Sequence, residues 1–195
     1  MSSSAHWRRP KIRRLVNIVV LPLITALVTV ALACVALGVW QPASYEVDGL
    51  LDAKGNSFSG VFSPGTDEFI GSVHLVFASS EVYEGGFAGN RFNGSGVLSG
   101  VETADDGTTN AWQFEGTFVN GRLEGQGSYT DNMGSYTGTF TNSLPNGQGV
   151  YSSNSGWRYE GEFQMGMMTG QGTVYLADGT SASGQFEDGL QVSTS

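Results

Sequence analysis

The stretch Tyr159–Gly172, YEGEFQMGMMTGQG, sets a pattern that recurs through most of the chain. With Tyr159 counted as position one, glycine stands at position three and an aromatic residue at position five. A turn doublet follows at positions seven and eight, and glycine returns at positions twelve and fourteen. The alternation within each half predicts two strands joined by a tight turn.

The same frame fits three further full copies, which begin at Tyr83, Phe114 and Tyr136. Weaker copies begin at Phe58 and Ala182. The starts of neighbouring copies are 22 to 31 residues apart. A period in this range indicates a repeat array, in which each unit stacks on its neighbours.

One repeat unit is expected to be a β-hairpin. Positions one, three and five share a face of the first strand, so two rings flank a glycine there. The doublets Asn120-Gly121 and Asp188-Gly189 are typical of hairpin turns, because both positions tolerate positive φ. A bare glycine leaves room for the ring of a neighbouring strand. Stacked hairpins predict an all-β repeat array, an elongated single-layer antiparallel sheet with a groove of aromatic residues and glycines on one face.

The motif Tyr159-Glu-Gly161-Glu-Phe163, followed by Gly170-x-Gly172, resembles the MORN repeat (membrane occupation and recognition nexus). The resemblance covers residues 58–190 as about six repeats. Such repeats occur in scaffolds, in membrane-junction proteins and as appendages of enzymes. The resemblance therefore implies a fold and an interaction role without naming a partner.

Charge is divided unevenly along the chain of 195 residues. Five of the nine basic residues lie within residues 8–14, whereas all eighteen acidic residues lie from Glu46 onward. The remainder holds four basic residues, so its net charge is −14. An acidic array repels phosphate backbones, which disfavours nucleic-acid binding. Cys34 is the single cysteine, so no disulfide framework forms within the chain.

The segment 15–40, LVNIVVLPLITALVTVALACVALGVW, carries no charge and follows the basic tail 1–14. About 20 apolar residues cross a bilayer core, so the segment predicts one N-terminal transmembrane helix. The basic tail predicts a cytoplasmic N-terminus and a C-terminal array outside the cytoplasm. We therefore expect a single-pass membrane protein that works within a membrane or envelope protein complex.

Other interpretations of this segment remain open. Cleavage as a signal peptide is disfavoured, because such peptides have a shorter apolar region of about 7 to 15 residues. Lipidation of Cys34 would fit the run Ala31-Leu-Ala33-Cys34, although the residues that follow stay apolar. Thr25, Thr29 and Ala33 form a row of small side chains that would let another helix pack closely.

Residues 41–57 are expected to form a stalk and a half-repeat, and residues 191–195 a C-terminal tail. The longest interval between repeats spans residues 99–113, which hold Asp105, Asp106 and Trp112. Its simplest interpretation is a hairpin that projects past its neighbours. A calcium loop is the alternative, but the acidic residues lack the alternating oxygen ligands of such loops. Projecting loops of repeat arrays often bind partners, so this hairpin is the best local site.

The sequence offers little catalytic chemistry. His6 precedes the apolar segment, and His74 is expected half-buried in a strand, with no serine or cysteine in a recognisable relation to it. No histidine pair has metal-ligand spacing. Glu160 and Glu162 face away from the rings and are expected on a solvated face. We therefore expect no enzyme activity and no cofactor or metal site.

The sequence thus predicts a non-enzymatic, membrane-anchored scaffold or adaptor that binds partner proteins. Its candidate contact residues are Tyr83, Phe87, Asp105, Asp106, Trp112, Phe114, Phe118, Tyr136, Phe140, Tyr159 and Phe163. The first duty of the rings is structural. The alternative is an envelope module that binds a glycan or peptide along the groove, which requires rings that stay exposed. Lipid-surface binding ranks lower, because the basic residues of the array form no polybasic cluster.

Overall fold

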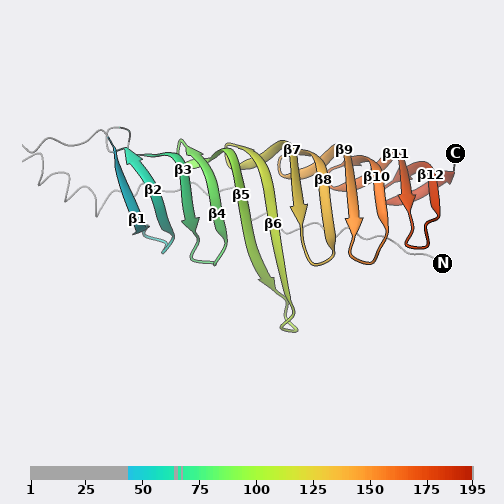
Figure 1. Ribbon diagram of the computed structural model, residues 1–195, viewed down its shortest axis with the longest axis horizontal. Coiled ribbons are helices and arrows are strands. Elements are labelled where there is room, and N and C mark those ends of the chain that lie inside the picture. Colours follow the sequence, from blue (N-terminus) through green and yellow to red (C-terminus); the bar gives the residue numbers. More distant parts are fainter. Residues whose placement is uncertain (1–43, 64–65, 67, 195) are drawn as a thin grey trace, which may run out of the picture.

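The computed structural model describes residues 44–63, 66 and 68–194. Within them, thirteen strands form one open antiparallel sheet, and neighbours in sequence are neighbours in the sheet (Figure 1). No helix occurs in this part of the chain. The strands are β1 (Tyr45–Leu51), β2 (Ser57–Ser63), β3 (Glu68–Val76), β4 (Val82–Ala88), β5 (Arg91–Thr103), β6 (Thr109–Val119), β7 (Arg122–Thr130), β8 (Gly134–Thr141), β9 (Leu144–Ser153), β10 (Arg158–Gln164), β11 (Met167–Tyr175), β12 (Ser181–Glu187) and β13 (Leu190–Thr194). The predicted all-β array of hairpins is confirmed.

The predicted transmembrane helix 15–40 lies outside the described residues, as do the basic tail 1–14, Cys34 and the row Thr25, Thr29 and Ala33. Among the residues that the structure describes, no helix is long and apolar enough to cross a membrane.

Tight turns with positive φ join the two strands of a repeat, as the doublets predicted. Asn120 and Gly121 have φ angles of 51° and 85°, and Asp188 and Gly189 have 48° and 82°. Ser143 stands at position eight of its repeat, where Gly121 and Gly189 stand in theirs, and its φ is 61°. The residue type did not predict a positive φ at this position. The turn geometry is therefore common to the repeats even where the turn residues differ.

A row of directly paired glycines crosses the sheet. It runs through Gly85, Gly96, Gly116, Gly127, Gly138, Gly149, Gly161, Gly172 and Gly184, each of which faces the next on a neighbouring strand. The backbones come close there, since a Cβ on Gly161 would lie 2.6 Å from the Cα of Gly172. A β-bulge follows, because Glu162 faces Thr169 after Gly161 has faced Gly172.

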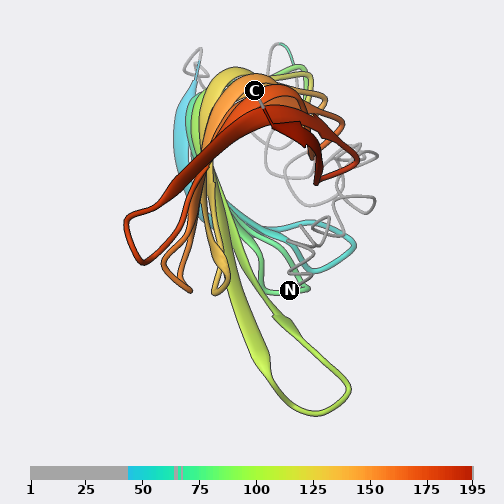
Figure 2. The ribbon, with the colours of Figure 1, turned by 90° about the vertical axis from the view of Figure 1, so that its right-hand side faces the viewer.

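The strands bend at this glycine row, and the sheet becomes a trough with an arched cross-section (Figure 2). Residues four apart on a straight strand are separated by about 13 Å, at about 3.3 Å per residue. The ring centroids of Tyr159 and Phe163 nevertheless lie 5.3 Å apart, and those of Tyr136 and Phe140 lie 5.1 Å apart. Rings from the two halves of one strand therefore meet inside the trough.

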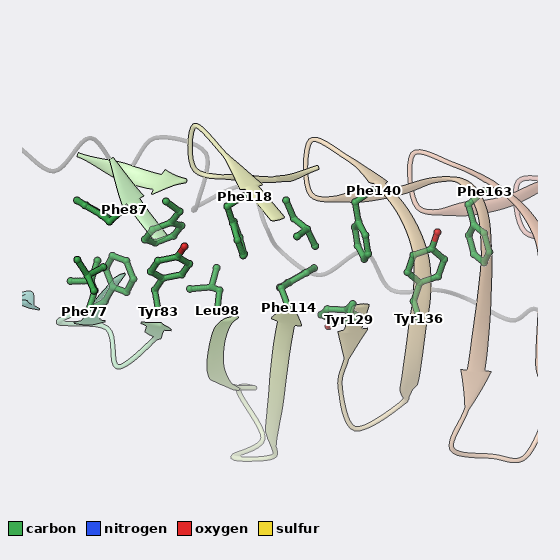
Figure 3. Close-up of a cluster of buried hydrophobic side chains, with 14 of the residues drawn as sticks. Phe77, Tyr83, Phe87, Leu98, Phe114, Phe118, Tyr129, Tyr136, Phe140 and Phe163 are labelled. Carbon is green, nitrogen blue, oxygen red and sulfur yellow. The ribbon is translucent and has the colours of Figure 1, made fainter. Parts of the chain in front are cut away.

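The core consists of two facing rows of side chains inside the trough (Figure 3). Position five supplies Phe87, Phe118, Phe140 and Phe163, and the facing row includes Tyr83, Leu98, Phe114, Tyr129 and Tyr136. Each of these side chains is at most 4% exposed. Rings also meet between repeats, as Tyr136 and Phe163 do with centroids 4.8 Å apart. The core is therefore continuous from one repeat to the next.

Position ten adds a buried residue that the sequence analysis missed. In the full repeats it is Phe92, Leu123, Pro145 or Met168, and each is at most 5% exposed. The carbonyl of this residue accepts a 2.9 Å hydrogen bond from the turn amide of the next repeat, from Gly121 to Phe92, Ser143 to Leu123 and Gly166 to Pro145. These bonds tie successive turns together along one rim of the trough.

Candidate interaction surfaces

The eight rings predicted as contacts lie inside the trough. Tyr83, Phe87, Phe114, Phe118, Tyr136, Phe140, Tyr159 and Phe163 are each at most 4% exposed. Their faces and edges meet other rings, as between Tyr83 and Phe118, whose centroids are 5.4 Å apart. The expectation of an open aromatic groove is therefore wrong, because the bend folds the ring-bearing face onto itself. The rings fill the space that a ligand would have needed.

The hydroxyl groups of the position-one tyrosines bond to the backbone. Each donates a hydrogen bond to the carbonyl three residues on, from Tyr83 to Gly86 at 2.8 Å, Tyr136 to Thr139 at 3.0 Å and Tyr159 to Glu162 at 3.1 Å. Burial raises the pKa of all three phenols, and that of Tyr159 rises to about 12. These groups are therefore neutral at ordinary pH and hold the backbone beside the glycine row.

Strands β5 and β6 project past their neighbours as one long hairpin (Figure 2). They contain 13 and 11 residues, against 7 in β4 and 9 in β7. Pairing continues to the tip, where Thr103 faces Thr109. Every residue from Val101 to Thr109 is exposed. The projecting hairpin predicted from the sequence is confirmed.

Asp105 and Asp106 lie exposed at the tip of this hairpin. The Oδ1 atom of Asp106 accepts hydrogen bonds from the hydroxyl and the amide of Thr108, at 2.6 Å and 2.9 Å. These two bonds hold the pKa of Asp106 below its usual value. In the described part of the chain, no group of three or more His, Cys, Asp or Glu side chains is arranged to hold a metal ion. Asp106 therefore stabilises the turn. The described residues of the hairpin offer no cluster of ligands that would support a calcium loop.

Trp112 stands at the root of the hairpin, half-buried, with its ring centroid 5.8 Å from that of Phe114. It faces Gly100 across the strand pair, and a Cβ on Gly100 would lie 2.6 Å from the indole ring. The ring of Trp112 therefore anchors the projecting hairpin to the core.

A pocket of about 460 Å³ lies at the root of the same hairpin. Its lining includes Val82, Val101, Ala111, Thr130 and Asp131. Val101 and Ala111 belong to the outer face, because they alternate with residues of β5 and β6 that face the trough. The sequence analysis missed this pocket, which brings together Ser80 from the β3–β4 turn, Asp131 from the β7–β8 turn and the root of the β5–β6 hairpin.

His74 is exposed rather than half-buried, so that expectation is wrong. Val73 and Leu75 are buried in the trough, and the alternation of the strand turns His74 outward. Its Nδ1 atom lies 2.8 Å from Oε1 of Glu84, and both side chains are largely solvated. This contact is a surface pair of small energetic value, on the order of 0–1 kcal/mol.

The carboxylates of Glu160 and Glu162 also engage surface partners. Glu160 lies 3.1 Å from Arg158, and Glu162 accepts a 3.3 Å hydrogen bond from the amide of Gln171. Arg158 in turn stands over the ring of Tyr175 at 4.3 Å from its centroid.

The repeat units match a known family model. The model of the MORN repeat matches residues 83–109, 114–135, 136–158 and 159–181. These four segments are MORN repeats. Each MORN repeat begins at the residue where a full copy of the sequence pattern begins, and such repeats suggest a repeat-based binding or scaffold role.

The hairpins that begin at Phe58 and Ala182 lie outside the matched residues, yet they extend the same sheet at its two ends. Among curated proteins, no relative matches the chain.

Proposed function

We propose that this protein is a non-enzymatic scaffold or adaptor. The segment 15–40 would hold it in a membrane, and the MORN array would bind and position partner proteins outside the cytoplasm. The observation that carries the proposal is the contrast between a filled interior and one exposed projection. The rings of the trough are buried against one another, whereas residues 101–109 of the β5–β6 hairpin are all exposed.

The construction of the array supports a positioning role. Hydrogen bonds of 2.9 Å join the turns of successive repeats, and the ring core runs through all of them. Each repeat is therefore braced by its neighbours, which favours a stiff spacer over a flexible linker. A stiff array carries a bound partner at a set distance from its anchor.

The chemistry of the surface supports protein partners over the alternatives. From Glu46 onward the chain has a net charge of −14, which repels anionic lipid surfaces and nucleic acids alike. Glycan binding along the rings would require exposed ring faces. The eight candidate rings are buried, so none offers a face for a sugar to stack on. The exposed hairpin remains as the most distinctive surface for a partner.

The test is a crosslinking capture with the full-length protein in its native membrane, followed by quantitative identification of captured proteins. One variant carries Asp105→Ser and Asp106→Ser. The matched control is Asp178→Ser, because Asp178 accepts the same two hydrogen bonds from Thr180, at 2.6 Å and 2.9 Å, in a turn that does not project. A third form has an unrelated span in place of residues 15–40.

We expect defined partners that the wild type and Asp178→Ser capture equally and the double variant captures poorly. Partners lost only with the exchanged span would move recognition to the Thr25, Thr29 and Ala33 row and make the array an accessory. The absence of any specific protein partner in all forms would overturn the scaffold proposal.

A further inference from the structure

Among the strands that the structure describes, none neighbours the projecting part of β5 on its side away from β6. The last residue of β5 that pairs with β4 is Ser99, which faces Val82. Beyond it, Gly100–Thr103 pair on one side only, with β6. This stretch is the outer edge of β5, and it presents the kind of backbone row to which an extended chain can add.

The hydrogen-bond pattern shows which backbone groups face the free side. The amide of Ala104 donates to the carbonyl of Thr108 at 2.8 Å, so these residues form a hydrogen-bonded pair at the tip. Such pairs alternate with non-hydrogen-bonded pairs along an antiparallel ladder. The pair of Val101 and Ala111 is of the second kind, so the N–H and C=O of Val101 point away from β6. The same holds for Thr103.

The outer face beside this edge carries the exposed apolar side chain of Val101 among polar neighbours such as Ser80 and Ser99. The side chain of Val101 is 61% exposed and borders the pocket of about 460 Å³, together with Val82 and Ala111. A strand added to β5 would place every second side chain over this pocket, because side chains alternate between the two faces. Apolar side chains at those positions would cover Val101 and Val82 and remove their surface from water.

The inner face beside the edge is acidic. Glu81 reaches this face, since its Cγ atom would lie 3.0 Å from a Cβ on Gly100, which faces Trp112 inside. Glu102 stands on the same face of β5 as Gly100. Burial raises the pKa of Tyr129, and the negative charges of Asp131 and Glu102 raise it further. Both carboxylates therefore lie near that phenol. Residues 77–82, 99–113 and 130–134 contain no lysine or arginine.

We propose that the outer edge of β5, Gly100–Thr103, accepts an extended segment of a partner protein in which basic and apolar side chains alternate. The apolar side chains enter the pocket beside Val101, and the basic ones face Glu81 and Glu102. The inference rests on the proposed scaffold function and names the chemistry of its partner. A second copy of this chain is a poor occupant, because its own edge carries the same acidic side chains.

The test measures the binding of a fluorescently labelled peptide of about seven residues, alternating lysine and valine, to the full-length protein in mild detergent. Fluorescence anisotropy reports the affinity, and a peptide of alternating glutamate and valine is the charge control. The variant Val101→Pro removes an amide that faces the free edge while leaving the ladder to β6 intact. The matched control is Ala111→Pro, which removes the equivalent amide on the opposite edge of the hairpin.

We expect the lysine–valine peptide to bind the wild type and Ala111→Pro, and Val101→Pro to weaken binding at least about tenfold. Glu102→Gln should weaken it about threefold at low salt. Equal binding by Val101→Pro and Ala111→Pro, or equal binding of the glutamate peptide, would overturn the proposed edge site.

Amide hydrogen exchange of the wild type provides a readout that does not depend on a proline variant folding. Bound peptide should slow exchange at Val101 and Thr103 but not at Ala111, and protection elsewhere alone would contradict the proposal. A wild type that captures partners but does not bind this peptide would refute the inference and leave the scaffold function standing. A wild type without partners would refute the scaffold function itself.

Discussion

The rings of Tyr159 and Phe163 lie 5.3 Å apart although both belong to strand β10. The contact exists because the strand bends between them, at Gly161. Protein cores usually form between two layers of secondary structure. Here the two halves of each bent strand serve as the two layers, so one sheet encloses its own core.

Substitution of Gly161 by valine should destabilise the array. The new side chain would start 2.6 Å from the Cα of Gly172 and 2.5 Å from the hydroxyl of Tyr159, and neither backbone nor buried ring can withdraw freely. We expect a loss of about 1–3 kcal/mol or more in unfolding free energy. Thermal melting of the full-length protein checks it, with Thr137→Val on the exposed face of β8 as the control. An unchanged melting temperature for Gly161→Val would refute the account of the bend.

Shortening the side chain at position ten of a repeat should lower the free energy of unfolding substantially, although no sequence motif marks this position. Leu123 is fully buried, so Leu123→Ala should lower stability by about 2–5 kcal/mol through lost burial and a cavity. Leu190 is 54% exposed on β13, and Leu190→Ala is the matched control, with an expected change within about 0.5 kcal/mol. Chemical denaturation followed by circular dichroism distinguishes them. Equal effects of the two substitutions would contradict the assigned core.

Removal of one phenol hydroxyl should weaken the backbone beside the glycine row. The hydroxyl of Tyr159 lies 3.1 Å from the carbonyl of Glu162 and 3.2 Å from that of Thr169. Tyr159→Phe leaves these carbonyls without that donor and should cost about 1 kcal/mol. Tyr175→Phe, at the exposed ring beneath Arg158, should cost little and serves as the comparison. A Tyr159→Phe protein as stable as the wild type would contradict a stabilising role for these hydrogen bonds.

Stability should fall at alkaline pH because of the buried phenols. The unfolded state releases the Tyr159 proton near the ordinary tyrosine pKa of about 10, whereas burial raises the pKa in the folded protein to about 12. Below the unfolded pKa both states keep the proton, so the full stability is present there. Between the two pKa values only the unfolded state loses it, so stability decreases as pH rises.

The melting temperature measured across this alkaline range checks the prediction. Tyr159→Phe should show a shallower decline than the wild type, because one titrating group is removed. Identical slopes for the two proteins would exclude a contribution from Tyr159.

The hairpins, their turns and the projecting hairpin could be predicted because their signals are local. Asn120 and Gly121 specify a turn through their own tolerance of positive φ, and Asp105 and Asp106 mark the centre of a longer interval in the repeat. Position ten was missed because phenylalanine, leucine, proline and methionine share no visible pattern. His74 was misplaced because its burial depends on which face of β3 turns inward.

The sequence by itself therefore determined that the chain forms stacked hairpins with rings and glycines on a common face. Only the tertiary structure decided that this face closes on itself, so that Tyr159 meets Phe163 and the predicted groove becomes a core. It also decided that Gly100–Thr103 of β5 has no second neighbouring strand among the described residues. The physical reason is that side chains alternate between the two faces of a strand, so the sequence of one strand shows which residues share a face. Bends and free edges depend instead on how several strands pack together.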